Sequence, residues 1–369
     1  MNLYLAFDHQ PLWFENPHEL VSCHFLSELM PTFKKIERWL DAGWHVAGYL
    51  SYEAGYGFEN RLCRSGKFAF PLMHMGAYRP PTKKKAMPGT AEPYQLSRLR
   101  LNTNFPEYRR AIQRIREYIA QGDVYQITYC IKNYFRFSGN PRRLFKELYR
   151  CQSVPYAAYV ETGEHAILSL SPERFIQKTG GYLLTEPMKG TWPRGSHPAQ
   201  DRRRRREFSR DPKNRAENLM IADLLRNDLG RIGTDIRAPQ LFTIRAYKTL
   251  FQMTSTITGK VPRNLHLGET FRALFPSGSV TGAPKIRAME IIREMEPEDR
   301  KIYTGAIGYI TPERNLYFNI PIRTLLIRGN EGEMGVGGGI VWDSTPRGEW
   351  REGRLKSRFL RDTARRPSR

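Results

Sequence analysis

The chain has 369 residues, of which 40% are hydrophobic and 12% aromatic, a composition typical of a folded protein with a large core. No run approaches about 18 uninterrupted apolar residues, so the sequence predicts no membrane span, and the N-terminus does not resemble a signal peptide. The net charge of +22 invites a nucleic-acid-binding hypothesis. However, no aromatic stacking ladder, zinc-finger spacing or RNA-binding signature accompanies the densest basic run, residues 202–206. We therefore expect no nucleic-acid partner and interpret that run as a solvated face that attracts anionic molecules.

The cysteine pattern indicates the compartment. Cys23, Cys63, Cys130 and Cys151 are widely spaced and form no CxxC pair. We expect them to be small buried side chains in a reducing compartment, which predicts a cytoplasmic protein.

The first part of the chain is predicted to contain short strands, such as 46–52, and a helix near 26–41. Residues 81–93, rich in proline and lysine, form the clearest linker by composition. The sequence therefore divides into an N-terminal segment, 1–93, and a larger domain, 94–369.

Beyond the linker, a helix is predicted from Phe105, with Pro106 in its first turn, to a stop at Gly122. Further strands are expected at 124–137, 156–161, 166–170, 173–178, 182–185, 251–259, 303–311, 315–328 and 332–341, and helices near 141–151, 199–229, 266–274, 283–295 and 344–363. Short turns join several strand pairs, for example at 178–182. These features favour an α+β fold with antiparallel sheet over a parallel Rossmann-like sheet.

Two glycine-rich segments, 278–285 and 337–339, are not nucleotide-binding motifs. Only three residues separate Gly278 from Gly282, and no lysine follows Gly282 directly, whereas a Walker motif requires four residues and an adjacent lysine. The second segment enters a predicted strand and not a helix. Each is either a simple turn or a place where backbone N–H groups approach an anion closely.

One carboxylate lies on the apolar face of a predicted helix. From residue 212 onward, Ile221, Leu225 and Leu229 form an apolar stripe, and Glu217 precedes Ile221 by one turn on the same stripe. A carboxylate in this position is costly unless it meets a cation or a hydrogen-bond donor.

A second group of charged residues shares one face of a C-terminal helix. Glu349, Glu352 and Lys356 recur at i, i+3 and i+7. On spacing alone, Glu352 and Lys356 also fit an ordinary surface ion pair.

The order of several separated motifs resembles that of the chorismate-utilising enzymes, a family that includes anthranilate, isochorismate and aminodeoxychorismate synthases. These motifs are residues 171–175 (SPERF), 186–191 (EPMKGT), 216–228 (AENLMIADLLRND), 275–285 (FPSGSVTGAPK) and 336–341 (VGGGIV). The resemblance implies two large, mostly antiparallel sheets packed together and flanked by helices. It also implies that 94–369 is a chorismate-binding catalytic domain, with 1–93 packed on it as a segment of the anthranilate synthase component I type.

Lys189 makes the chain resemble the aminodeoxychorismate synthase component I group, and residues 48–55 (GYLSYEAG) agree. That resemblance implies a transferase that makes 4-amino-4-deoxychorismate from chorismate and ammonia, for p-aminobenzoate and folate biosynthesis. No Cys-His-Glu glutaminase triad is evident in the sequence, so ammonia would come from glutamine through a separate amidotransferase subunit, component II.

Three alternatives remain open. Anthranilate synthase component I would carry a small residue at position 189, and an isochorismate or salicylate synthase would carry a lysine base in place of Gln126. A nucleic-acid-binding protein would explain the charge but not the series of motifs.

The resemblance also implies roles for single residues. Lys189 would be the nucleophile, Glu173 the general acid, and Glu217 and Glu352 the ligands of Mg²⁺. The implied substrate contacts are Gly190, Thr191, Tyr303, Arg323, Gly337, Gly338, Gly339 and Lys356.

Overall fold

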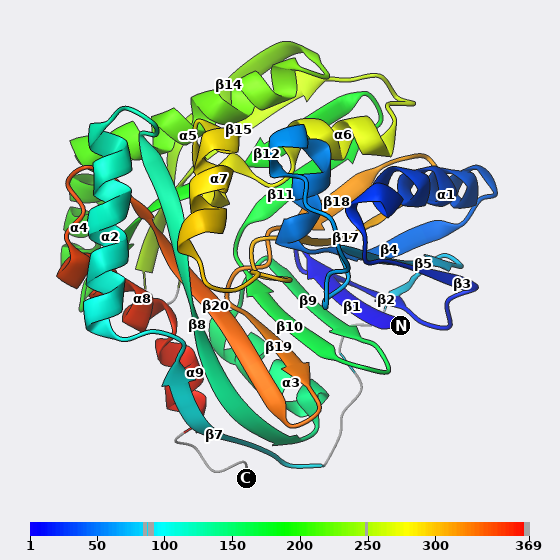
Figure 1. Ribbon diagram of the computed structural model, residues 1–369, viewed down its shortest axis with the longest axis horizontal. Helices are drawn as coiled ribbons and strands as arrows, with labels where there is room; N and C mark the ends of the chain where they lie inside the picture. The colour runs from blue at the N-terminus through cyan, green and yellow to red at the C-terminus, as the bar shows by residue number, and fades with distance from the viewer. Residues whose placement is uncertain (84–86, 88–91, 248–249, 365–369) are drawn as a thin grey trace.

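Two antiparallel β-sheets form the centre of the protein (Figure 1). The computed structural model describes residues 1–83, 87, 92–247 and 250–364. The first sheet contains β1 (Asn2–Phe7), β2 (Gln10–Phe14), β6 (Thr82–Lys83), β7 (Tyr94–Leu101), β8 (Gln126–Gly139), β9 (Tyr156–Glu161), β10 (Ala166–Ser171), β16 (Gly282–Ala283), β19 (Thr324–Arg328) and β20 (Glu331–Ile340). The second contains β3 (Glu19–Cys23), β4 (His45–Leu50), β5 (Met73–Tyr78), β11 (Arg174–Thr179), β12 (Tyr182–Glu186), β13 (Met188–Pro193), β14 (Thr234–Ala246), β15 (Leu250–Lys260), β17 (Ala306–Ile310) and β18 (Leu316–Asn319).

The sheets pack face to face through apolar side chains from both. One buried cluster joins Leu5 of β1 and Ile167 of β10 to Tyr49 of β4 and Ile307 of β17. Helices lie outside the sheets: α1 (Leu29–Asp41), α2 (Phe105–Ala120), α3 (Pro141–Gln152), α4 (Pro198–Arg210), α5 (Pro212–Gly230), α6 (Leu267–Leu274), α7 (Lys285–Met295), α8 (Pro346–Lys356) and α9 (Arg358–Ala364). The expected α+β fold of two packed antiparallel sheets is therefore confirmed.

The N-terminal segment contributes strands to the interior of both sheets. β1 lies between β2 and β9 in the first sheet, and β4 lies between β5 and β17 in the second. Part of the predicted linker, 84–86 and 88–91, falls outside the described residues, and the proposed division after residue 93 stays a prediction.

Local sequence signals explain where the helices begin. The side chain of Asn104 accepts a hydrogen bond from the backbone N–H of Glu107 at 3.0 Å, and Glu107 reciprocates, so α2 begins with a capping box. The predicted helix 199–229 is instead two helices, because Asp211 is extended and caps α5 while Pro212 occupies its first turn. The predicted helix 344–363 is likewise divided, at Ser357, into α8 and α9.

The prediction of one strand over 315–328 was wrong. The chain leaves the second sheet after β18 and enters the first sheet as β19. Between them Arg323 adopts a left-handed conformation with φ of 51°, and its carbonyl accepts a hydrogen bond from the N–H of Leu170. The prediction of four buried cysteines was also wrong, since Cys63 and Cys151 are exposed.

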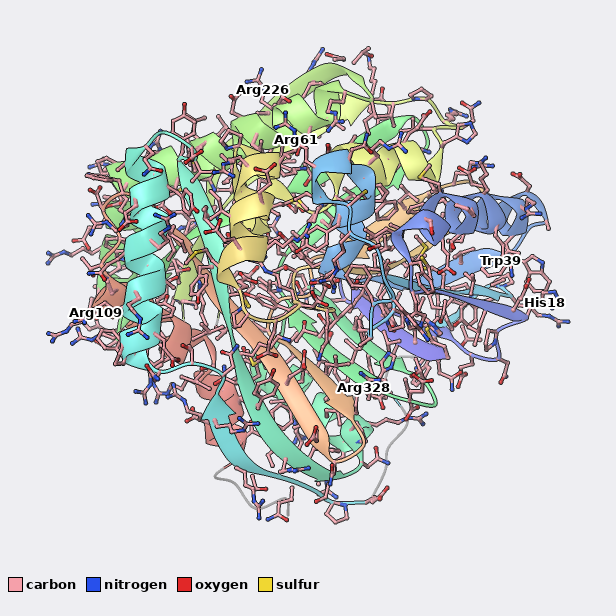
Figure 2. All side chains as sticks on the ribbon, viewed as in Figure 1. His18, Trp39, Arg61, Arg109, Arg226 and Arg328 are labelled. Atoms are coloured by element: carbon pink, nitrogen blue, oxygen red, sulfur yellow. The ribbon has the colours of Figure 1, made fainter. Side chains whose placement is uncertain are left out.

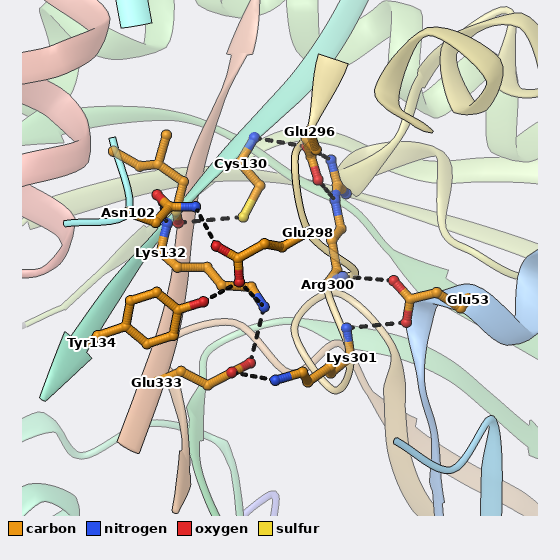
Figure 3. A network of polar contacts seen from close by, with 11 residues as sticks. Glu53, Asn102, Cys130, Lys132, Tyr134, Glu296, Glu298, Arg300, Lys301 and Glu333 are labelled. Atoms are coloured by element: carbon orange, nitrogen blue, oxygen red, sulfur yellow. Dashed lines mark hydrogen bonds and ion pairs between the residues drawn. The ribbon is translucent and has the colours of Figure 1, made fainter. Parts of the chain in front are cut away.

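A buried polar network supports β20, the strand that carries Gly337–Gly339 (Figure 3). The guanidinium of Arg300 donates to both carboxylate oxygens of Glu296, at 2.6 and 2.8 Å. Glu53 of the 3₁₀ helix η2 (Tyr52–Phe58) accepts the backbone N–H groups of Arg300 and Lys301, and Lys301 pairs with Glu333 on β20. The network thus ties the N-terminal segment to β20.

The excess positive charge is spread over several elements. Arg61, Arg109, Arg226 and Arg328 are all exposed and come from parts of the chain far apart in sequence (Figure 2). Among the helices that the structure describes, none has the length and hydropathy of a membrane-spanning segment.

Candidate active site

Lys189 lies on β13, at a bulge where that strand pairs with β15. The next residue, Gly190, has φ of +84°, a conformation that L-residues with a Cβ rarely adopt. A Cβ on Gly190 would lie 2.5 Å from Oδ1 of Asn214 in the first turn of α5. The glycine therefore lets the first turn of α5 approach the strand beside Lys189. Thr191, also predicted as a substrate contact, is exposed on the same strand.

The amine of Lys189 lies close to Gly339 on β20. A Cβ on Gly339 would lie 3.0 Å from Nζ of Lys189 and 3.0 Å from Cδ of Gln126. Gln126 is fully buried, and neither of its amide atoms has a hydrogen-bond partner among the described residues. Burial lowers the pKa of Lys189, an effect that the nearby Glu217 opposes and the positive charge of Lys356 reinforces. Both effects that lower the pKa favour the neutral, nucleophilic amine.

Glu173 lies in the turn between β10 and β11 and is almost fully buried. Its Oε1 accepts hydrogen bonds from the hydroxyl of Ser279, at 2.7 Å, and from the backbone N–H of Met188, at 3.2 Å. Burial raises the pKa of Glu173 to about 7, although the bonds from Ser279 and Met188 and the nearby Lys189 lower it. A carboxyl group with such a pKa is protonated in part of the population near neutral pH and can act as a general acid.

Three charged residues of α8 face the glycines of β20, as the helix pattern indicated. A Cβ on Gly338 would lie 3.0 Å from Oε2 of Glu349, 3.8 Å from Oε1 of Glu352 and 3.9 Å from Nζ of Lys356. Lys356 pairs with Glu352 at 2.8 Å and donates to the carbonyl of Gly337, also at 2.8 Å. The attraction of Lys356 lowers the pKa of Glu352.

Glu217 approaches this group from α5. Its side chain is half-buried on the same helix stripe as the buried Ile221 and Leu225. Burial raises the pKa of Glu217, the charge of Lys189 lowers it, and the negative charge of Glu352 raises it further. Glu217 and Glu352 therefore lie within electrostatic range of each other.

These acidic side chains fit Mg²⁺ better than a softer metal. The described residues contain no group of three or more His, Cys, Asp or Glu side chains arranged to hold a metal ion. The two carboxylates of Glu217 and Glu352 nevertheless supply hard oxygen donors, and the missing Cβ of Gly338 lets β20 lie close to the carboxylates of Glu349 and Glu352. Mg²⁺ commonly binds one or two carboxylates and completes its shell with water and substrate oxygens.

Tyr303 and Arg323 lie at the edges of this arrangement. The buried ring of Tyr303 packs against Gly335 of β20, two residues before the glycine run. Arg323 is half-buried, burial lowers its pKa, and the ionisable group that opposes this shift is Tyr247. No hydrogen bond joins either side chain to Lys189, Glu173, Glu217 or Glu352 within the described part of the chain.

The sequence-predicted residues therefore fall into two sets. Lys189, Glu173, Glu217, Glu352, Lys356 and Gly337–Gly339 converge, whereas Gly190, Thr191, Tyr303 and Arg323 lie around them. The sequence prediction missed Ser279, Tyr247 and Glu349 as members of the site. Glu349 had a sequence signal in its place on the same helix face as Glu352, and Ser279 lies within the motif 275–285, whereas Tyr247 had none.

Known proteins share both the sequence pattern and this fold. The family profile described as chorismate binding enzyme matches residues 15–362, so the chain belongs to that family. Over 255 residues it is 41% identical to aminodeoxychorismate synthase component 1 of Klebsiella aerogenes, a match that covers 69% of this chain and 56% of the relative. Over 263 residues it is 36% identical to anthranilate synthase component 1 of Aquifex aeolicus, with 71% of this chain and 53% of the relative covered.

The chain thus spans little more than half the length of these relatives. Among solved structures, the menaquinone-specific isochorismate synthase of Escherichia coli matches with a TM-score of 0.80 at 17% identity, over 99% of this chain and 88% of that one. This likeness shows the shared fold.

Proposed function

We propose that this protein acts as an aminodeoxychorismate synthase component 1, which converts chorismate and ammonia to 4-amino-4-deoxychorismate and water. The observation that carries the proposal is the place of Lys189 beside Gly339, within electrostatic range of the buried acid Glu173. Four relatives that bear this name are 38–41% identical to the chain. Folate biosynthesis and a cytoplasmic location are part of the same proposal.

In the first half of the reaction, the neutral amine of Lys189 attacks C2 of chorismate. The C1=C2 double bond moves to C1=C6, the C5=C6 double bond moves to C4=C5, and the C4–O bond breaks. Glu173 gives its proton to the departing hydroxyl, which leaves as water, and Glu173 becomes a carboxylate. Its raised pKa, about 7, supports this role because the acid holds a proton near neutral pH.

In the second half, ammonia attacks C4 and the double bonds return to their original positions. The C2–N bond breaks and releases the amine of Lys189, while the ammonium proton at C4 passes back to Glu173. Because Lys189 occupies C2 during this step, ammonia is directed to C4. Gln126 has no basic group, so water is not activated in its place.

The remaining charged residues suit the two carboxylates of the substrate. Glu217 and Glu352 would hold Mg²⁺, which when bound supplies positive charge to grip the ring carboxylate. The guanidinium of Arg323 is suited to bidentate contact with the enolpyruvyl carboxylate. Lys356, which already contacts the carbonyl of Gly337, would neutralise further negative charge beside the glycines.

The decisive experiment is to identify the product. Purified protein is incubated with chorismate, Mg²⁺ and ammonium. The products are separated by liquid chromatography and identified by mass spectrometry. The proposal expects 4-amino-4-deoxychorismate. Anthranilate as the main product would instead establish the second candidate, anthranilate synthase component 1, which relatives at 36–38% identity favour.

A further inference from the structure

The segment Ser277–Lys285 is held by packing between α5 and the first sheet. Its short 3₁₀ helix η4 (Gly278–Val280) begins with Ser277 as its cap. A Cβ on Gly278 would lie 2.5 Å from Cδ2 of Leu224 on α5, and one on Gly282 would collide with the carbonyl of Gln126 on β8. Close packing therefore accounts for both glycines without a bound anion.

This packing delivers one side chain of the segment to Glu173. The hydroxyl of Ser279 donates to Oε1 of Glu173 at 2.7 Å, and Ser277 Oγ lies 3.0 Å from Ser279 Oγ. All three side chains are buried. The Ser279 hydroxyl has only one proton and donates it to Glu173. In the contact between the two serines, Ser277 is therefore the donor and Ser279 Oγ the acceptor.

The two oxygens of Glu173 consequently differ. Oε1 faces two donors, the Ser279 hydroxyl and the Met188 N–H, whereas Oε2 accepts no hydrogen bond from any described residue. A neutral carboxyl group has one O–H, and an O–H placed on Oε1 would face both donors at short range. The proton of the neutral acid is therefore expected on Oε2.

We propose that Ser279 is a positioning residue that holds Oε1 of Glu173 as the proton-free oxygen, so that Oε2 delivers the proton to the leaving hydroxyl. This inference rests on the proposed function for the identity of the leaving group. Lys189 from β13, Lys356 from α8 and Tyr247 from the segment after β14 are the other ionisable groups that act on Glu173. Ser279 differs from them because it fixes the orientation of the carboxyl group and not only its charge.

The test compares variants that remove or keep the hydroxyl. Ser279→Ala should lower kcat about tenfold with little change in KM, because the loss of a hydrogen bond to a charged group typically costs this much. The alkaline limb of the kcat profile, where Glu173 loses its proton, should move to higher pH because the carboxylate loses a donor. Ser279→Thr should restore both values, and Ser277→Ala, the matched control, should shift the limb by less than half as much.

Infrared difference spectroscopy provides a readout that needs no turnover. The C=O stretching band of protonated Glu173, assigned by its absence in Glu173→Gln, should titrate at higher pH in Ser279→Ala than in the natural protein. If that variant does not fold, Ser279→Cys fills the position with a slightly larger side chain, weakens the hydrogen bond and should shift the band in the same direction. An unshifted band, or equal defects in the alanine and threonine variants, would overturn the positioning role. A shifted band in a protein that forms no 4-amino-4-deoxychorismate would refute the proposed function and leave the positioning role intact.

Discussion

Lys189 offers the sharpest test of the proposed chemistry at the level of one side chain. If its amine forms a bond to C2, both Lys189→Ala and Lys189→Arg should lose at least about a thousandfold in turnover, since removal of a nucleophile costs that much or more. If the side chain supplied only positive charge, the arginine variant would retain substantial activity. Mass spectrometry of the natural protein quenched during turnover should show an adduct of chorismate minus water, absent from Lys189→Ala.

The acidic pair Glu217 and Glu352 leads to a prediction about metal binding. Glu217→Gln and Glu352→Gln keep the size of the side chain but remove a charge. Each variant should therefore bind Mg²⁺ at least about tenfold more weakly than the natural protein does. Isothermal titration calorimetry measures this directly, without turnover. Glu269→Gln, on the exposed surface of α6, is the matched control and should bind Mg²⁺ as the natural protein does. Undiminished affinity in both test variants would exclude the pair as the metal site.

At the residue scale, the sequence predicted side chains whose neighbours come from the same helix or strand. Glu217 and the face shared by Glu349, Glu352 and Lys356 follow from the helix period alone. The contact between Ser279 and Glu173 joins residues that are 106 positions apart. A partner at such a distance is set by the packing of the segment 277–285 between α5 and β8 of the first sheet, which no local pattern encodes.

At the scale of elements, Gly190 couples β13 to α5. Gly190→Ala should lower the free energy of unfolding by about 2 kcal/mol or more, because it combines backbone strain at positive φ with a collision against Asn214. Gly180→Ala is the matched control: its φ is also positive, at 57°, but no atom lies within 4 Å of an added Cβ. It should cost about 1 kcal/mol, from strain alone.

Urea unfolding of the two variants measures this difference. Adding Asn214→Gly to Gly190→Ala should recover the part of the loss that comes from the collision. Equal losses of unfolding free energy in Gly190→Ala and Gly180→Ala would show that close contact between α5 and Gly190 does not contribute to stability.

Two errors in the predicted strands have separate physical causes. No strand was predicted from the sequence over 234–246, because β14 has no buried side chain and so lacks the core-facing apolar run that marks a buried strand. The apolar run at 315–328 has strand character throughout, and the break lies near Arg323, where φ is 51° and the carbonyl accepts a hydrogen bond from the N–H of Leu170 on the first sheet. The break between α4 and α5, in contrast, carried a readable signal, since Asp211 followed by Pro212 is typical of a helix start.

At the scale of the whole molecule, the proposed activity depends on how nitrogen reaches the site. The sequence shows no glutaminase triad, so the isolated chain should use ammonium and not glutamine as its nitrogen source. Glutamine should support turnover only after a separate amidotransferase subunit is added. Assays with equal concentrations of ammonium and glutamine, in the presence of chorismate and Mg²⁺, measure this preference. Glutamine-dependent product from the isolated chain would contradict the prediction.

The placement of the N-terminal strands inside both sheets has a consequence for how the protein folds during its synthesis on the ribosome. Asn2 of β1 pairs with Glu161 of β9, and Leu50 of β4 pairs with Ala306 of β17. While the chain is being made, the apolar strands near its start therefore emerge from the ribosome long before the strands that will flank them. Pairing across such sequence distances is slow, and unpaired strand edges are prone to aggregate. We expect the nascent chain to depend on chaperones until about residue 310 has been synthesised, and its yield of native protein to improve when translation is slowed or cooled.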